Sequence, residues 1–391
     1  MQHNVKIVIG ANYGDEGKGL MSRYFTKKFV NNGKHPITVF HNGTAQRGHT
    51  ADYEDGSRHI FHNFGAGTKE GGATFYAASF LVHPMDFCRE LDELQYVPEV
   101  YCDPGCVVVT PVDMLADQII EDYIAVKSGA REYGSCCYGS WSTTDRILQR
   151  PDLSYTVSQF LDGDYWQKMS SLHEWLRWRL REFHVDIGMV QQWEPYISET
   201  SERWNGMCAH FCKDLIRFCG TIHCQKFDEI WRRYDSVIFE GAQGILLDKD
   251  RTEENGWTTT SKTGLHNPAR MLSDYSDFFA EVCYVTRPYI TRHGNGTLPC
   301  EVERATLNAL AEPGIQIIDR TNPYNPFQGN LRYALSNMKK ITQAAELDFA
   351  KEENGRNYGF SMAVTHYNEC DDAGGDYRSY STCEVIEVWN T

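Results

Sequence analysis

The sequence has no apolar run that approaches the ~20 residues a helix needs to cross a bilayer. It is also short of positive charge, because 38 lysines and arginines face 53 aspartates and glutamates, for a formal net charge of −15. Such an acidic chain lacks the basic face that binding to nucleic acid or to a membrane surface requires. We therefore expect neither partner, although a local basic pocket for a small phosphorylated ligand is compatible with this charge.

A secretory signal is missing too: no basic stretch followed by an apolar one opens the chain, so we expect a cytoplasmic protein. The 13 cysteines include no paired C-x-x-C units, and free thiols in a reducing compartment are the default for them. One group could supply zinc ligands, namely Cys208, Cys212, Cys219, Cys224, His210 and His223. Because its spacing is irregular and its neighbours are apolar, we prefer buried thiols and keep zinc as the alternative.

Neither internal repeats nor low-complexity segments interrupt the 391 residues. Apolar runs rich in β-branched residues predict strands at residues 5–9, 37–40, 107–111, 236–239, 282–287 and 361–364. Helical patterns lie between them, at residues 20–29, 114–127, 172–183 and 337–347. This alternation predicts an α/β fold with a large, mainly parallel central sheet and helices on both faces. We expect one domain over residues 1–391, with inserted helical subregions at about 115–235.

The chain is organised around residues 5–19, VKIVIGANYGDEGKG, where a predicted strand leads through a glycine-rich turn into a helix. Such a turn aims backbone N–H groups at a phosphate, and Lys18 adds a positive charge. Asp15 and Glu16 are unexpected there, because carboxylates repel phosphate, unless one of them binds Mg²⁺ or acts as a base. The ordinary P-loop has Ser or Thr after its lysine, whereas Gly19 follows Lys18, which disfavours a P-loop ATPase acting on protein or nucleic acid.

The string GDEGKG at residues 14–19 resembles the N-terminal signature of the adenylosuccinate synthetase family. Four further segments are similar to motifs of that family: GHT at 48–50, FEGAQG at 239–244, TTTS at 258–261 and YITRHGNG at 289–296. In the last of these the family pattern is Tyr-x-Thr-Arg-Val-Gly-x-Gly. The resemblance implies a P-loop-NTPase-like fold, Mg²⁺ as cofactor, and a homodimer in which a partner arginine reaches the nucleotide phosphate.

The reaction of that family places clear demands on side chains. The O6 atom of a 6-oxopurine is a poor nucleophile until N1–H is deprotonated, which a nearby carboxylate can do. Transfer of the γ-phosphoryl group to O6 then needs a cation-like donor and Mg²⁺ to neutralise charge. Asp15 suits the base, His49 the charge-stabilising acid and Lys18 the phosphates. The resemblance implies the same roles, and it implies that the Asp15 carboxylate and the Gly48 carbonyl bind Mg²⁺.

Other functional positions are carried over from the family residue by residue. The resemblance implies contacts with the nucleoside triphosphate and its phosphates at Gly14, Glu16, Gly17, Gly19, Thr50 and Asn368. It implies contacts with the nucleoside monophosphate at Gln46, Ser135, Cys136, Arg146, Gln243, Thr259, Thr260 and Arg292. It implies that L-aspartate is held by Thr321, Arg320 and Arg332.

Two segments depart from the family. The loop that grips aspartate normally carries an arginine run, because a dicarboxylate needs bidentate cations, but only Arg320 and Arg332 remain here. Asn368 stands where the family reads the guanine of GTP with an aspartate, and a neutral amide can pair with adenine instead. We therefore predict ATP or dATP over GTP. This change and segments 134–150 and 268–270 resemble the phage branch called PurZ, some members of which have serine where Asp15 stands.

The sequence thus predicts a ligase that condenses L-aspartate with a 6-oxopurine nucleoside monophosphate. The preferred acceptor is dGMP, which would yield the succinylated precursor of 2-aminoadenine, in the host cytoplasm if the chain is encoded by a phage. The alternative is conversion of IMP and GTP to adenylosuccinate. A second alternative is a non-catalytic nucleotide-binding protein that kept the fold, which the arginine-poor aspartate loop would explain.

Overall fold

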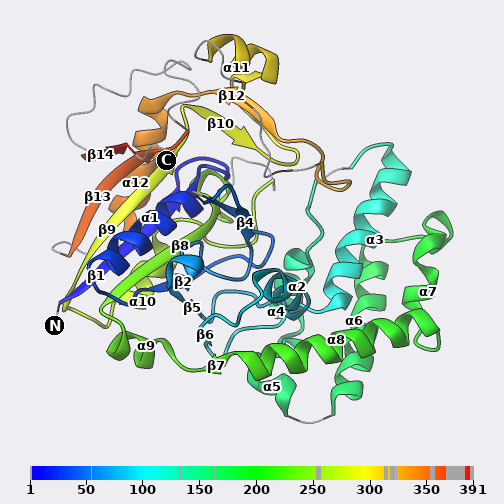
Figure 1. Cartoon of the computed structure of the whole chain (residues 1–391). Helices are drawn as coiled ribbons and strands as arrows, with labels where there is room; N and C mark the ends of the chain where they lie inside the picture. The colour runs from blue at the N-terminus through cyan, green and yellow to red at the C-terminus, as the bar shows by residue number, and fades with distance from the viewer. Residues whose placement is uncertain are drawn as a thin grey trace.

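The computed structural model describes residues 2–53, 55–131, 134–162, 164–251, 257–311, 316–317, 322, 324–352, 357–366 and 384–387. Within them the central sheet has nine strands in the order β14-β13-β9-β1-β8-β2-β5-β6-β7, and all neighbouring strands are parallel (Figure 1). The strands are β1 (His3–Gly10), β2 (Ile37–Phe40), β5 (Ala73–Tyr76), β6 (Val100–Cys102), β7 (His223–Cys224), β8 (Ser236–Gly244), β9 (Phe278–Thr286), β13 (Tyr358–Val364) and β14 (Glu384–Glu387). The predicted α/β class with a mainly parallel sheet is confirmed.

Helices cover both faces of this sheet because its central strands are apolar on both sides. On β1, Val5, Ile7 and Ile9 belong to one core, whereas Val8 points to the opposite core, as the period of two requires. The first face is covered by α9 (Phe227–Arg233), α10 (His266–Leu272) and α12 (Met338–Glu352), and the second by α1 (Lys18–Asn31). A sheet buried on both faces explains why these strands read as nearly continuous apolar runs.

The carboxyl ends of the parallel strands meet at one edge, where open α/β sheets bind their ligands. Two small sheets lie at this edge: the hairpin β3 (His49–Asp52) with β4 (Arg58–Phe61), and the sheet β10 (Tyr289–Arg292), β12 (Arg332–Leu335) and β11 (Glu301–Val302). Figure 1 shows β10 and β12 beyond the carboxyl end of β9, with α11 (Arg304–Leu310) next to them. These additions bring polar loops over the end of the main sheet.

A third apolar core lies beyond β5 and β6, where a group of helices packs together. These helices are α2 (Pro84–Leu94), α3 (Pro111–Ser128), α4 (Ser140–Gln149), α5 (Val157–Leu161), α6 (Tyr165–Glu182), α7 (Glu194–Ile197) and α8 (Glu202–Thr221). The strand predicted at 107–111 is wrong, because Val107 and Val108 form only isolated bridges. Pro111 instead begins α3, behind a capping box formed by Thr110 and Asp113.

Helix α3 carries three fully buried carboxylates on one face, at Asp113, Asp117 and Glu121. Residues spaced by four lie above one another on a helix, so the three side chains form a row. Each carboxylate binds a different residue of the segment that runs from residue 134 into α4. Asp113 pairs with Arg146, and Asp117 accepts a hydrogen bond from Ser142. Glu121 accepts a hydrogen bond from the backbone N–H of residue 135. The row fixes this segment against α3.

The remaining sequence predictions concern cysteines, membrane spans and domain division. Cys208 is buried on α8, whereas Cys224 is exposed on β7. Among the described residues, no group of three or more His, Cys, Asp or Glu side chains is arranged to hold a metal ion. No helix in the described part of the chain is both long and apolar enough to cross a membrane. The division into one domain with inserted helices stays a prediction.

Candidate active site

A cavity of 1180 Å³ opens at the carboxyl edge of the central sheet. Its charge is opposite to that of the whole chain, since the described lining carries eight lysines and arginines and only two carboxylates. The cations are Lys18, Arg23, Lys27, Arg47, Arg58, Arg89, Arg287 and Arg292, and the carboxylates are Asp15 and Asp52. Low-dielectric walls of one charge sign concentrate ligands of the other, so the cavity suits a phosphorylated ligand.

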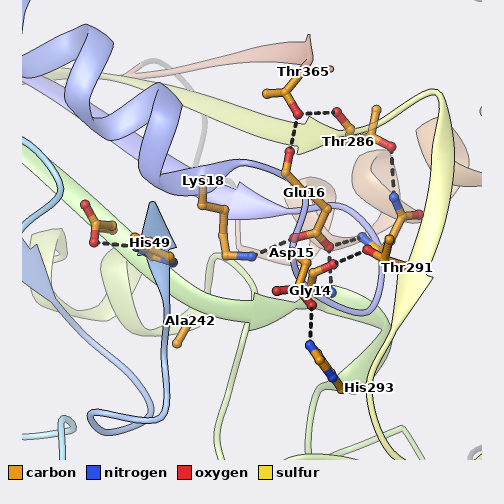
Figure 2. A network of polar contacts seen from close by, with 12 residues as sticks. Gly14, Asp15, Glu16, Lys18, His49, Ala242, Thr286, Thr291, His293 and Thr365 are labelled. Carbon is orange, nitrogen blue, oxygen red and sulfur yellow. Dashed lines mark hydrogen bonds and ion pairs between the residues drawn. The ribbon is translucent and has the colours of Figure 1, made fainter. Parts of the chain in front are cut away.

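The loop between β1 and α1 is shaped by Glu16, whose side chain is buried. Its Oε1 atom accepts from the backbone N–H groups of Asn12 and Gly14, and its Oε2 atom lies 2.6 Å from Nζ of Lys18 (Figure 2). Only glycine fits at position 10, at the end of β1, because a Cβ there would lie 2.3 Å from the Glu16 carboxylate. Glu16 does not line the cavity. Its predicted contact with phosphate is therefore corrected: it braces the loop and is the counter-ion of Lys18.

Gly17 begins the turn into α1 in the left-handed region, with φ 92°. A Cβ at this position would lie 2.7 Å from Oγ1 of Thr365, the residue that follows β13. Thr365 donates from the same hydroxyl to the backbone carbonyl of Glu16 (Figure 2). The residue that follows β13 thus fixes the glycine-rich turn, and the predicted phosphate contacts Gly14, Gly17 and Gly19 all line the cavity.

Asp15 also has left-handed backbone geometry, with φ 63°, which is uncommon for a residue that carries a side chain. Its side chain is 20% exposed and lines the cavity, in contrast to that of Glu16. Its Oδ2 atom lies 3.5 Å from Nε2 of His293, which follows β10 (Figure 2). The two neighbouring carboxylates therefore have different tasks, since Asp15 faces the cavity and Glu16 faces the protein.

His49 lies at the start of β3 and contacts Glu240 in the middle of β8. Its Nδ1 atom is 2.6 Å from Oε1 of Glu240, and Nη1 of Arg47 lies 3.6 Å from the same oxygen. Burial lowers the pKa of His49, and the Glu240 carboxylate opposes that shift. Burial alone would raise the pKa of Glu240, but His49 and Arg47 together outweigh it and lower the pKa. Glu240 is therefore an anion that holds Nδ1, which leaves Nε2 as the ring atom for a ligand.

Two glutamines supply amide groups to the cavity, Gln46 after β2 and Gln243 near the end of β8. The Oε1 atom of each is buried without a hydrogen-bond partner among the described residues. Buried polar atoms are almost always satisfied, so such orphan atoms at a cavity wall mark positions for a ligand or for water. Both residues were predicted to contact the nucleoside monophosphate, and the structure brings them to one cavity.

Hydroxyl and thiol groups predicted to hold the nucleotide phosphate come from two loops. Ser135 and Cys136 precede α4, Thr259 and Thr260 follow β8, and all four line the cavity. The two loops are joined where Oγ1 of Thr144 donates to Oγ1 of Thr260 at 3.2 Å. Burial raises the pKa of the Cys136 thiol to about 11, so this group is a neutral, weak hydrogen-bond donor.

Comparison with known proteins decides the family. The model of the family described as adenylosuccinate synthetase matches residues 7–322, which is most of the chain. This chain belongs to the adenylosuccinate synthetase family. Curated relatives include adenylosuccinate synthetase from Psychrobacter arcticus, 26% identical over 308 residues that cover 76% of this chain and 65% of the relative. The Thermotoga maritima enzyme is 26% identical over 311 residues, covering 76% and 67% respectively. The matched part of this chain thus spans about two thirds of these relatives' length.

Solved structures agree on the fold. The fully ligated adenylosuccinate synthetase from Plasmodium falciparum superimposes with a TM-score of 0.66 at 15% identity, over 92% of this chain and 76% of that chain. The succinoaminodeoxyadenylate synthetase (PurZ) of cyanophage S-2L, bound to dGMP and dATP, gives a TM-score of 0.57 at 14% identity. That match covers 93% of this chain and 85% of the phage chain. At these identities the likeness shows a common fold.

Arg146 is a correction to the family-based assignment. Its guanidinium is fully buried and forms a bidentate ion pair with Asp113, with N–O distances of 2.9 and 2.8 Å. Its remaining donors reach the backbone carbonyls of Leu153 and Val108, so every nitrogen has a partner within its own chain. It does not line the cavity. Arg146 therefore joins α3 to α4.

Two further arginines are occupied by their own loops. Arg332 pairs with Glu301 at 2.6 Å and donates to the carbonyls of Gly294 and Gly296, and it does not line the cavity. Its predicted contact with aspartate is therefore wrong in this geometry. Arg292 does line the cavity, but its guanidinium donates to backbone carbonyls of residues 295, 297 and 257. The predicted residues Arg320, Thr321 and Asn368 lie outside the described part of the chain.

Several residues in the cavity lining or directly behind it were not predicted from the sequence. Glu240 and Arg47 were missed, although the acidic residue within FEGAQG and the cation beside Gly48 were visible signals. His293 was read only as a position where the family has Val. Other described lining residues without a predicted role include Tyr13, Tyr138, Trp257, Arg287, Tyr289 and His366. Burial and the Arg287 charge lower the pKa of His366, so this ring is neutral.

The donors of the predicted magnesium site fit the ion. Asp15 and Gly48 both line the cavity, and a carboxylate and a carbonyl are the oxygen ligands that Mg²⁺ prefers. Mg²⁺ is usually bound by one or two carboxylates together with substrate phosphates, so a complete protein cage is not required. The eight cations around the cavity are consistent with phosphates that complete the coordination. Asp15 and the Gly48 carbonyl are thus the groups that would hold the ion.

Proposed function

We propose that this protein is a purine-nucleotide ligase that condenses L-aspartate with a 6-oxopurine nucleoside monophosphate at the expense of a nucleoside triphosphate. One observation carries the proposal: the cavity brings together Asp15, Lys18 and His49. Asp15 lies in the loop after β1, Lys18 begins helix α1, and His49 begins strand β3 of a separate small sheet. A carboxylate, an ammonium and an imidazole are the groups that deprotonation of N1 and phosphoryl transfer to O6 require.

In the proposed mechanism, Asp15 accepts the N1 proton of the acceptor base, so that O6 becomes nucleophilic. The oxygen attacks the γ-phosphorus of the triphosphate, and the nucleoside diphosphate leaves. His49 acts as an imidazolium that the Glu240 anion at Nδ1 stabilises, and its Nε2 donates a hydrogen bond to the transferring group. Lys18 neutralises phosphate charge from the helix N-terminus, and Mg²⁺ held by Asp15 and the Gly48 carbonyl would supply further positive charge to the phosphates. The amine of aspartate then displaces inorganic phosphate at C6.

The contacts of the monophosphate are assigned to other residues of the cavity lining. The orphan amide oxygens of Gln46 and Gln243 suit donors on the nucleotide, and the hydroxyls of Ser135, Thr259 and Thr260 suit its 5′-phosphate. Thr50 lies beside His49 and suits the triphosphate. Arg332 is paired with Glu301, so for the aspartate carboxylates we propose Arg320 and Thr321, which lie outside the described part of the chain.

For the acceptor we propose dGMP, and for the donor ATP or dATP. The proposal rests on the neutral Asn368 in place of the family's guanine-reading aspartate, and on the other sequence features of the phage branch. The structural neighbour from cyanophage S-2L, which binds dGMP and dATP, is compatible with this choice. IMP with GTP is the competing pair, since the curated relatives are adenylosuccinate synthetases. A homodimer is likewise proposed from the family alone.

The test is a matrix of purified protein with dGMP, GMP or IMP, with ATP or GTP, and with L-aspartate and Mg²⁺. Phosphate release and mass spectrometry of the nucleotide product report turnover. We expect a succinylated product from dGMP, with ATP better than GTP. Rapid turnover of IMP without turnover of dGMP would overturn the choice of acceptor. Nucleotide binding without phosphate release from any acceptor would overturn the ligase and favour a non-catalytic nucleotide-binding protein.

A further inference from the structure

The end of β10 touches the β1–α1 loop at consecutive residues of both segments. The guanidinium carbon of Arg292 lies 4.4 Å from the ring centroid of Tyr13, a cation–π contact. Oγ1 of Thr291 donates to the backbone carbonyl of Gly14 at 3.1 Å (Figure 2). Because β10 is itself held in a ladder with β12, it forms a firm support for the loop. The loop between β1 and α1 is thus positioned from outside the main sheet.

The next pair in this series is His293 with Asp15, at 3.5 Å between Nε2 and Oδ2. Among the described residues, no other side chain forms an ion pair or a hydrogen bond with this carboxylate. Nδ1 of His293 is buried without a partner in the described structure, so Nε2 is the ring nitrogen that faces the Asp15 carboxylate. The family motif has Val at this position, and Val cannot donate a hydrogen bond.

A carboxylate on a left-handed residue at a cavity wall can rotate unless something holds it. A base that must accept a particular proton needs its atoms held within about 0.5 Å of the productive position. We propose that His293 is the positioning residue for Asp15: it holds Oδ2 and so leaves Oδ1 to accept the proton of the acceptor base. This inference rests on the proposed function for its role in catalysis, whereas the contact itself can be tested without activity.

The kinetic test compares His293→Val, which restores the family residue, with His293→Gln, whose amide can still donate. We expect His293→Val to lower kcat by about 10-fold or more, with KM for both nucleotides changed less than about 3-fold. His293→Gln should regain most of kcat. The matched control is His210→Val, because the His210 side chain is exposed on helix α8, lies 3.4 Å from the carboxylate of Asp214 and does not line the cavity. An unchanged kcat in His293→Val, or an equal loss of kcat in His293→Val and His293→Gln, would overturn the proposal.

The contact is tested independently by a double-mutant cycle of Asp15→Asn and His293→Val, read by urea denaturation. If the two side chains interact, the effects of the single changes on unfolding will not add in the double variant. Additive effects would overturn the contact and with it the proposal. Should the wild-type protein show no ligase activity, the proposed function fails, while non-additivity in this cycle would still establish that His293 holds Asp15.

Discussion

Asp117 on α3 offers the sharpest quantitative prediction. Its carboxylate is fully buried, and Oδ1 accepts from the backbone N–H and the hydroxyl of Ser142 at 3.1 and 2.7 Å. Oδ2 has no partner among the described residues. Burial, reinforced by the Asp113 carboxylate, raises the pKa of Asp117 from 3.8 to about 7, against the opposing hydrogen bonds of Ser142. The folded protein therefore retains a proton that the unfolded chain releases.

The sign of the pH dependence follows from this difference. Because the folded pKa is higher than the unfolded one, stability is lost as the pH rises from about 3.8 to about 7, and the loss is complete above that window. A difference of roughly 3 pKa units corresponds to about 4 kcal/mol of unfolding free energy. Asp117→Asn keeps an acceptor for Ser142 but never ionises, so it avoids this cost. Its stability advantage over wild type should grow by roughly 1.4 kcal/mol between about pH 6 and pH 8.

The assay is urea denaturation followed by tryptophan fluorescence at several pH values, with thermal melting as a second probe. Asp113→Asn on the same helix is the contrasting control. It weakens the ion pair with the buried Arg146, so it should destabilise the protein over the whole pH range. An advantage of Asp117→Asn that does not change with pH, or a loss of stability at about pH 8, would refute the reasoning.

Three further predictions concern the site and its supports. Asp15→Asn should lower the rate of phosphoryl transfer by at least about 100-fold while nucleotide binding, measured by calorimetry, persists; full activity would contradict its role as base. Glu240→Gln should lower kcat by about 10-fold to 100-fold, because His49 loses its anionic partner. An unchanged kcat would show that the contact between His49 and Glu240 has no role in catalysis. Arg146→Met should cost about 3–5 kcal/mol of unfolding free energy by leaving Asp113 buried without its cation, whereas loss of nucleotide affinity at full stability would restore the family assignment.

Much of the fold was readable from local pattern. The apolar run before Gly10 and the glycines after it specify a strand, a tight turn and a helix, because these preferences act over a few residues. Helix α3 was expected from residue 114 but begins at Pro111, where a capping box replaces the predicted strand. The short strands β5 and β6 were not predicted, since three or four buried residues carry no period that distinguishes them from loop.

By itself, the sequence determined which residue types the site could contain, because the motifs around Asp15, His49 and Gln243 are contiguous strings. Only the tertiary structure decided which of those groups face a ligand. His49 meets Glu240, 191 residues later in the chain, because the fold brings the start of β3 beside the middle of β8. Asp15 and Glu16 are neighbours that point to opposite sides of one loop, and no pattern of residue types distinguishes them.

The arginines show most clearly the difference between what the sequence determines and what the tertiary structure decides. A motif could suggest that Arg146 and Arg332 bind substrates, since a guanidinium suits any phosphate or carboxylate. In the folded chain Asp113 and Glu301 bind these arginines instead, and both ion pairs join segments separated by about 30 residues. The sequence fixes the charge of a side chain, but its partner depends on how strands and helices are ordered in space, and that order is a property of the whole fold.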